Sequence, residues 1–362
     1  MSDLYSFNRD FFKKLPKTDL HVHLDGSLRL STIMKMAEEQ SVNLGVDSEE
    51  ELRALISPGK NHKSLEDYLK GFNITLQVLQ KPEALYRAAY ELAEDNALEN
   101  VKYMEVRYSP VLHTQKKIPL TNIVEAVLEG LKDAENDFDI KTGVILCGIR
   151  NISPEVSMQM AELAVAFKNR GVVGFDLAGA EYNYPAREHL DAFNLILSNN
   201  VNVTIHAGEA YGPDSIHQAL HYCGAHRIGH GTRLRENGDL LNYVNNHRIP
   251  LEICPSSNVQ TGTVPSLKNH PFKFYLDLGL RVTINTDNRL ITDTTMTDEF
   301  FRIHKHFNLS PEDIKTLSIN GIKSAFLHFE YRKWFLRKIK ESVDNLIETH
   351  KKKSGAQDAQ KK

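Results

Sequence analysis

Cysteine is scarce in this sequence. The 362 residues contain three cysteines, Cys147, Cys223 and Cys254, which lie far apart and form no CxxC pair. An odd number of widely spaced cysteines excludes the disulfide framework that stabilises many small secreted proteins. We therefore expect a protein of a reducing compartment, and the cytoplasm is the predicted location.

Long apolar runs and a charge excess of one sign are also missing. No stretch approaches the roughly 20 apolar residues of a membrane-spanning helix, and residues 1–16 lack the apolar centre of a signal peptide. The formal net charge of −3 gives no electrostatic reason to expect nucleic acid or a membrane surface as a partner. The 41% of hydrophobic and 25% of charged residues are typical of a globular protein.

Short apolar runs alternate with helical patterns along most of the chain. Ser153 and Ser310 each begin a Ser-Pro-Glu sequence, which is typical of a helix start. Eight β-branched runs, each followed by a helical pattern, indicate a parallel sheet covered by helices. They predict an α/β fold of the (β/α)₈ or TIM-barrel type. The predicted strands are "LHVHL", "VKYMEVRY", "TGVILCGI", "VVGFDLAG", "VNVTIHAG", "HRIGHG", "IPLEICPSSN" and "RVTINTDN".

The domain organisation predicted from these patterns is simple. No linker or repeat divides the chain, so we expect one domain over residues 1–350, acting as a monomer. The gap between the first two strands is the longest, and it predicts a helical insertion over about residues 28–98. An insertion at this place would cover the barrel mouth as a lid. The basic, weakly apolar segment 351–362 is predicted to be disordered.

Side chains that bind metals or transfer protons lie where the predicted strands end. Active sites of this fold form at the carboxyl ends of the strands. His21 and His23 are two residues apart, so on a strand they point to the same face. The polar residues at or just after strand ends are His21, His23, Asp25, His206, Glu209, His230, Asp287 and Asn288.

A zinc site is the predicted use of four of these residues. Three imidazoles and one carboxylate are donors that zinc binds, with a further position left for water. We therefore expect one Zn²⁺ per chain, held by ligands from three strand ends. The predicted ligands are His21, His23, His206 and Asp287.

Other histidine pairs in the chain favour different interpretations. His304 and His306 repeat the HxH spacing, but their segment is helical, and we expect a solvent-exposed helix face. His217 and His221 have the spacing of helical zinc ligands. Gln218, however, stands where a metalloprotease needs its catalytic glutamate. The segment "GVVG" lacks the GK[ST] sequence of a nucleoside-triphosphate site.

Zinc with a neighbouring acid and imidazole indicates hydrolysis in which an amine leaves. Zinc lowers the pKa of bound water to about 7 and so supplies hydroxide near neutral pH. Glu209, three residues after His206, is placed to exchange protons with a substrate. His230 is a second acid–base group or a group that positions the hydroxide.

Six motifs resemble the adenosine deaminases of the amidohydrolase superfamily. They follow that family's order and spacing from Pro16 to about Leu327, and together they are highly specific. The general character of the chain is similar to the apicomplexan branch. The motifs are "DLHVHLDGS", "FDLAGAE", "TIHAGE", "RIGHG", "CPSSN" and "NTDN".

The resemblance implies a role for each site residue. Zinc would be held by the four ligands named above. Glu209 would protonate the purine ring nitrogen beside the attacked carbon, while His230 and Asp287 would orient and deprotonate the attacking water. Gly179 would present its backbone to the purine, and Asp25 would contact the ribose.

The resemblance also implies the reaction. Adenosine, and with it 2′-deoxyadenosine, would be converted to the inosine product and ammonia in purine salvage. 5′-Methylthioadenosine is a further candidate substrate. The expected partner is thus a small purine nucleoside rather than nucleic acid or a membrane.

Two positions depart from the pattern of the family. Ala180 stands where the family commonly has an aspartate, so a carboxylate near the ribose is missing. Asn288 stands where the family commonly has a second aspartate beside the zinc ligand, and its amide donates hydrogen bonds without having to be protonated.

Three other functions remain open from the sequence. Adenine deaminases tend to carry glutamate at the position of Asp25, and AMP deaminases would need basic residues for the phosphate and usually a long N-terminal extension. A catalytically inactive relative that acts as a binding or growth-factor-like protein is the alternative from a different class. Such a protein would have no need of the four ligands and Glu209.

Restoring the missing carboxylate tests the interpretation of the first departure. We expect Ala180→Asp to tighten nucleoside binding, because a carboxylate accepts hydrogen bonds from ribose hydroxyls. Steady-state kinetics with adenosine should show a lower KM. An unaltered KM would contradict this interpretation.

Overall fold

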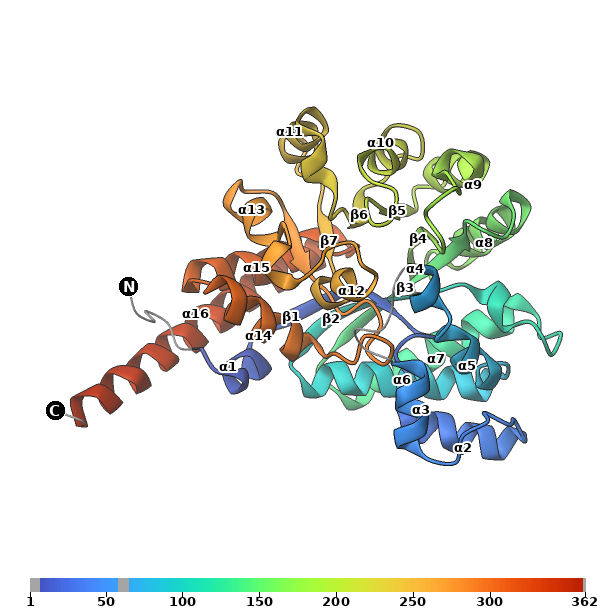
Figure 1. The fold of residues 1–362 in the computed structure, drawn as a ribbon, viewed down its shortest axis with the longest axis horizontal. Helices are drawn as coiled ribbons and strands as arrows, with labels where there is room; N and C mark the ends of the chain where they lie inside the picture. The colour runs from blue at the N-terminus through green and yellow to red at the C-terminus, as the bar shows by residue number, and fades with distance from the viewer. Residues whose placement is uncertain (1–6, 58–64, 361–362) are drawn as a thin grey trace.

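Eight parallel strands form a barrel at the centre of the described part of the chain (Figure 1). The computed structural model describes residues 7–57 and 65–360. Each strand pairs in parallel with the next one in the sequence. All eight predicted strands are present, which confirms the TIM-barrel fold. They are β1 (Lys17–His23), β2 (Val101–Tyr108), β3 (Lys141–Ile149), β4 (Val172–Ala178), β5 (Asn202–Ala207), β6 (Arg227–His230), β7 (Leu251–Ile253) and β8 (Val282–Ile284).

The barrel closes between β1 and the segment that follows β8. Val22 forms a parallel bridge with Asp287. The amide of Asp287 donates to the carbonyl of His21 at 2.8 Å, and the amide of His23 donates to the carbonyl of Asp287 at 2.7 Å. The hydrogen bonds that close the barrel therefore also bring Asp287 beside His21 and His23.

Helices surround the strands, and their starts follow the predicted capping chemistry. The Ser153 side chain accepts from the amide of Val156, and Ser310 forms a capping box with Asp313. The helices between and around the strands are α1 (Arg9–Lys14), α2 (Leu30–Gln40), α3 (Glu49–Ile56), α4 (Leu65–Leu69), α5 (Phe72–Val78), α6 (Pro82–Leu98), α7 (Leu120–Asp137), α8 (Pro154–Phe167), α9 (Leu190–Ser198), α10 (Pro213–His221), α11 (Gly238–Asn246), α12 (Pro255–Gln260), α13 (Phe272–Asp277), α14 (Met296–Phe307), α15 (Pro311–Ser324) and α16 (Phe329–Gln360). Short 3₁₀ helices span Pro110–His113, Ala186–His189, Leu234–Glu236 and Leu267–Asn269.

The segment between β1 and β2 is helical, with α2 to α6 in its described part. Its contacts with the loop after β8 include an ion pair and a hydrogen bond between two hydroxyl groups. Arg53 pairs with Asp293 at 2.5 Å, and the hydroxyls of Tyr68 and Thr292 lie 2.6 Å apart. Residues 58–64 of the expected insertion lie outside the described residues. Its action as a lid stays a prediction.

Two local expectations are wrong. The run "IPLEICPSSN" forms a strand only at β7, because Pro255 begins α12, where a proline at the first turn needs no partner for its nitrogen. His304 lies on helix α14 as expected but is buried. Its ring lies 5.6 Å from that of Phe7 and 5.3 Å from that of Phe12, so only His306 of the pair is exposed.

The C-terminal helix α16 extends away from the barrel (Figure 1). It reaches Gln360, although we expected disorder from residue 351; residues 361–362 lie outside the described residues. Lysine, alanine and glutamine favour helix, and a helix already formed extends without a new nucleation step. Among the helices that the structure describes, none combines the length and the apolar character that a membrane crossing requires.

Candidate metal centre and active site

Four potential ligand atoms converge at the carboxyl ends of the strands. The Nε2 atom of His206 lies 3.0 Å from Nε2 of His21 and 3.2 Å from Nε2 of His23. Asp287 Oδ1 lies 3.4 Å from Nε2 of both His21 and His23. These separations are of the size found between ligand atoms that share one ion with bonds of about 2.0–2.2 Å. The structure thus brings together the four predicted metal ligands.

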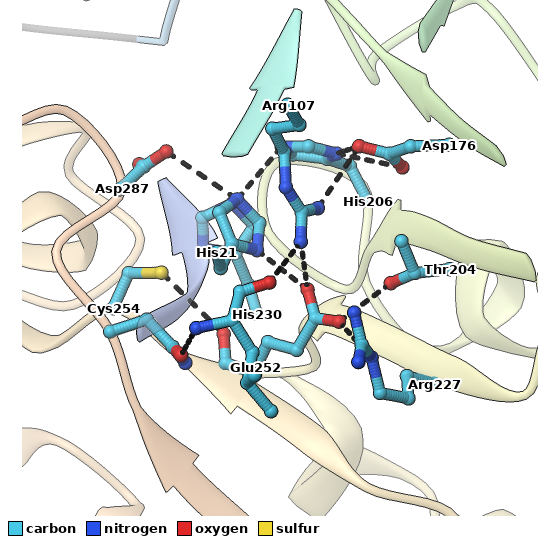
Figure 2. Close-up of polar contacts among 12 residues, drawn as sticks. His21, Arg107, Asp176, Thr204, His206, Arg227, His230, Glu252, Cys254 and Asp287 are labelled. Carbon is cyan, nitrogen blue, oxygen red and sulfur yellow. Dashed lines mark hydrogen bonds and ion pairs between the residues drawn. The ribbon is translucent and has the colours of Figure 1, made fainter. Parts of the chain in front are cut away.

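The hydrogen bonds of the imidazoles show that a cation fits between them. The Nδ1 atom of His21 lies 2.8 Å from Glu252, and that of His206 lies 2.9 Å from Asp176 (Figure 2). A carboxylate accepts only, so both Nδ1 atoms carry the proton and both Nε2 atoms of the neutral rings present lone pairs. Two such lone pairs 3.0 Å apart repel each other, and either a proton on His206 or a bound metal ion relieves this repulsion.

The electrostatics keep most of this donor set in the form that a metal binds. Burial, together with the charge of the Arg107 guanidinium, lowers the pKa of His21 to about 4, so this imidazole is neutral at neutral pH. Burial opposes the charge of Asp287, but hydrogen bonding and charge from the histidines hold its pKa well below the usual range. For His206, Asp176 outweighs burial and raises the pKa, so protons compete with metal there.

A buried ionic network inside the barrel supports the ligands from below. Arg107 pairs with Asp176 at 3.0 Å and with Glu252 at 2.8 Å, and it therefore joins the carboxylates behind His206 and His21 (Figure 2). Arg227 pairs with Glu252 and with Glu105, both at 2.5 Å. Fully buried ion pairs are costly to desolvate, and removing one partner is strongly destabilising because it leaves a buried charge uncompensated. Here the network fixes both carboxylates that orient the imidazoles.

The backbone is left-handed at two of the site residues. His230 and Asp287 both have a φ of 63°, a value that non-glycine residues rarely adopt. Each such residue costs about 1–3 kcal/mol, and surrounding structure has to hold it in place. Ser257 helps to hold Asp287 in place, because its hydroxyl donates to Oδ2 at 2.6 Å. Oδ1 then faces the histidines.

Glu209 lies in the same site as a buried carboxyl group. Its Oε1 accepts from the Thr261 hydroxyl at 3.0 Å, and its Oε2 lies 3.6 Å from Nε2 of His230. Burial raises the pKa of Glu209, although the neighbouring His230 opposes this shift. A carboxyl group with a raised pKa holds its proton closer to neutral pH, as a general acid must.

The loop that carries Glu209 is held by another buried carboxylate. Glu181 accepts hydrogen bonds from four successive backbone amides, at distances of 2.5 to 3.2 Å. The donors are the amides of Gly208, Glu209, Ala210 and Tyr211. Glu181 follows Ala180, the position of the first departure, and it fixes the backbone from which the Glu209 side chain extends.

The predicted substrate-binding residues follow the carboxyl ends of β1, β4 and β8, and two of them have spare hydrogen-bonding capacity. Asp25 Oδ1 and Asn288 Oδ1 are buried and have no hydrogen-bond partner in the structure. Burial raises the pKa of Asp25 to about 7. The Asn288 amide donates to the Tyr68 hydroxyl at 2.8 Å. Gly179, at the end of β4, has a φ of 91°, and a Cβ atom there would lie 2.6 Å from Asn151 Oδ1.

Comparison with known proteins identifies the family. The Adenosine deaminase family model matches residues 16–342. The chain belongs to the adenosine deaminase family. It is 43% identical over 341 residues to an adenosine deaminase of Mycobacterium ulcerans, covering 89% of this chain and 93% of the relative. It is 39% identical over 325 residues to one of Clostridium acetobutylicum, covering 90% and 97%. The chain is therefore a hydrolase of the adenosine deaminase type.

Solved structures of related deaminases share the fold. Adenine deaminase from Arthrobacter aurescens matches with a TM-score of 0.86 and 25% identity, covering 92% of this chain and 99% of that one. Arabidopsis N6-mAMP deaminase matches with a TM-score of 0.82 and 28% identity, with the same coverage. The relatives named above by sequence are bacterial. Assignment to an apicomplexan branch stays a prediction.

The sequence patterns missed the residues that support the adenosine deaminase site. Asp176 and Ser257 lie inside the motifs "FDLAGAE" and "CPSSN", which carried no role for them. Arg107 and Glu252 lie within predicted strands, and no local signal shows which face of a strand turns inward. His230 also offers a potential ligand atom, and it and the ligand atoms of His21, His206 and Asp287 all lie within 4.8 Å of one another. His230 thus lies near enough to compete with His23 for a place among the ligands.

Loss of the Asp176 charge should weaken metal binding. Asp176→Asn keeps the volume but removes the anion that raises the basicity of His206, so we expect metal affinity to fall about 10- to 100-fold. Competition with a chelating dye measures this constant. Asp139→Asn is the matched control, because the Asp139 side chain is 91% exposed. Equal affinities for the two variants would show that Asp176 does not support the metal.

Proposed function

We propose that this chain is a zinc-dependent adenosine deaminase of purine salvage. It would convert adenosine and 2′-deoxyadenosine to the inosine product and ammonia. Membership of the family supports hydrolytic deamination of the adenosine deaminase type. The convergence of three imidazoles and Asp287, with protonatable Glu209 beside them, is the observation that carries the proposal.

The proposed metal is one zinc ion per chain. His21, His23, His206 and Asp287 would hold it. Imidazole and carboxylate donors suit zinc, whereas calcium and magnesium prefer oxygen ligands alone. Bound zinc would supply hydroxide near neutral pH by lowering the pKa of water.

The protein groups would then handle the protons of the reaction. The attacking oxygen forms a bond to carbon 6 of the purine, while Glu209 gives its proton to the adjacent ring nitrogen. Asp287 would take the proton of the attacking water and return it to the amino group, which departs as ammonia when the C–N bond breaks. The proton of the new hydroxyl group would pass back to Glu209 as the carbonyl at carbon 6 forms. Thr261 occupies Oε1 of Glu209, so the transferable proton resides on Oε2.

The nucleoside would be recognised by groups that lack partners in the structure. Asp25 would contact the ribose, and Asn288 the purine, through their unpartnered oxygens and the amide of Asn288. The Gly179 backbone would face the purine ring. The resemblance implies a carboxylate near the substrate at the position of Ala180, so a 5′-methylthio substituent would meet no charge from this residue. We therefore include 5′-methylthioadenosine among the proposed substrates.

Several broader properties belong to the same proposal. We propose a cytoplasmic enzyme that acts as a monomer and binds neither nucleic acid nor membranes. Three scattered, buried cysteines and a net charge of −3 support this. Adenine and AMP are the competing substrates, since structural neighbours act on adenine and on N6-mAMP.

A deamination assay on zinc-loaded protein tests the proposal. We expect turnover of adenosine, 2′-deoxyadenosine and 5′-methylthioadenosine, but not of adenine or AMP, followed by ultraviolet absorbance and ammonia release. Glu209→Gln should lower kcat about 10²- to 10⁴-fold with zinc retained, because the general acid is lost. Glu236→Gln, at an exposed carboxylate outside the site, is the control. Turnover of adenine or AMP alone would overturn the proposed substrate.

A further inference from the structure

A chain of three hydrogen bonds joins a backbone amide to His230. The Phe272 amide donates to Nδ1 of His270 at 3.0 Å. Nε2 of His270 lies 3.2 Å from Oδ1 of Asn258. Nδ2 of Asn258 lies 3.1 Å from Nδ1 of His230. All three side chains are buried, with exposed fractions of 4% or less.

The first bond sets the tautomer of His270. A backbone amide only donates, so Nδ1 of His270 has to be the acceptor and carries no proton. Burial, together with the nearby charge of Arg235, lowers the pKa of His270 to about 3. The neutral ring therefore carries its proton on Nε2, which donates to the oxygen of Asn258.

The orientation of the Asn258 amide follows from its two donors. Its Oδ1 accepts from Nε2 of His270 and also from the Thr232 hydroxyl at 3.0 Å. The nitrogen of the amide is then the atom that faces His230. Because an amide nitrogen only donates, Nδ1 of His230 has to accept.

We propose that His270 and Asn258 are positioning residues that lock neutral His230 in the tautomer protonated at Nε2. This tautomer deepens the proposed function, and its catalytic role rests on that function. The Nε2 atom lies 3.6 Å from Glu209 Oε2, and the centre of the His230 ring lies 4.8 Å from that of His21 and 5.2 Å from that of His206. His230 accordingly presents an N–H donor, not a lone pair, to the reacting groups.

This tautomer determines which histidine completes the metal ligands and which residue accepts the proton of the attacking water. A protonated Nε2 does not bind a metal, so His23 rather than His230 completes the ligand set with His21, His206 and Asp287. Nor does it accept the proton of the attacking water. That proton goes to Asp287, while His230 donates a hydrogen bond that orients the attacking oxygen.

Nitrogen NMR of zinc-loaded protein labelled with ¹⁵N-histidine tests the tautomer directly. The His230 signals are assigned by their loss in His230→Gln. We expect an unprotonated, imine-type Nδ1 and a protonated, pyrrole-type Nε2. A protonated Nδ1 in the unaltered protein would overturn the proposal. This readout needs no substrate, so it stands apart from the deamination assay: absent turnover of any purine would refute the proposed function alone.

Asn258→Asp reverses the polarity of the last bond at nearly constant volume. A carboxylate accepts where the amide donated, so Nδ1 of His230 should become protonated. We expect kcat for adenosine to fall about 100-fold, with KM within about threefold and zinc content unchanged.

Asn242→Asp is the matched control. It makes the same change at an exposed asparagine outside the site, so the His230 tautomer should persist and kcat should stay within about twofold. If Asn258 had only a structural role, the nitrogen signals of His230 would be unchanged in Asn258→Asp. That result would overturn the proposal.

Discussion

The site depends on the hydrogen bonds between buried carboxylates and the far sides of two imidazoles. Glu252 holds His21, and Asp176 holds His206. In both bonds the Nδ1–H group donates to the carboxylate. The Nε2 atoms of the neutral rings therefore carry lone pairs, and they lie 3.0 Å apart. Without a cation this arrangement is repulsive, and with one it is a ligand set. The buried carboxylates therefore orient the imidazoles before any metal binds.

The barrel interior stabilises the buried charges of this arrangement. Asp176 and Glu252 are fully buried carboxylates, and they are stable as anions because Arg107 reaches both of them across the barrel interior. Burial alone would neutralise such groups, yet the pKa of each is lowered, chiefly because its partners' charges and hydrogen bonds outweigh desolvation. Closure of the barrel then brings Asp287 beside His21 and His23 through backbone hydrogen bonds.

The sequence predicted the parts of this structure that have a local or periodic signal. The eight strands and the Ser-Pro-Glu helix starts follow from apolar runs and capping residues. Strand ends marked the polar residues that meet at the mouth, because parallel strands deliver their carboxyl ends to one edge. Even there a limit appeared at "IPLEICPSSN", where the proline ended the strand and placed Ser257 and Asn258 on a helix.

The rest required contacts between residues far apart in the chain. Glu252 meets His21 across 231 positions, and neither residue carries a local sign of the other. The partners that orient Asn258 lie just after β6 and just before α13, so neither the spacing nor the composition of the sequence reveals the tautomer of His230. His304 shows the same limit, since its burial depends on Phe7 and Phe12 from the N-terminal segment.

X-ray absorption spectroscopy of the zinc-loaded enzyme, combined with its metal content, tests the central claim most directly. The account predicts one zinc per chain, bound by three imidazole nitrogens and by oxygen, because the Nε2 atom of His230, the fourth imidazole, offers no lone pair. A chain that binds no zinc, or a spectrum that requires four imidazoles, would contradict it.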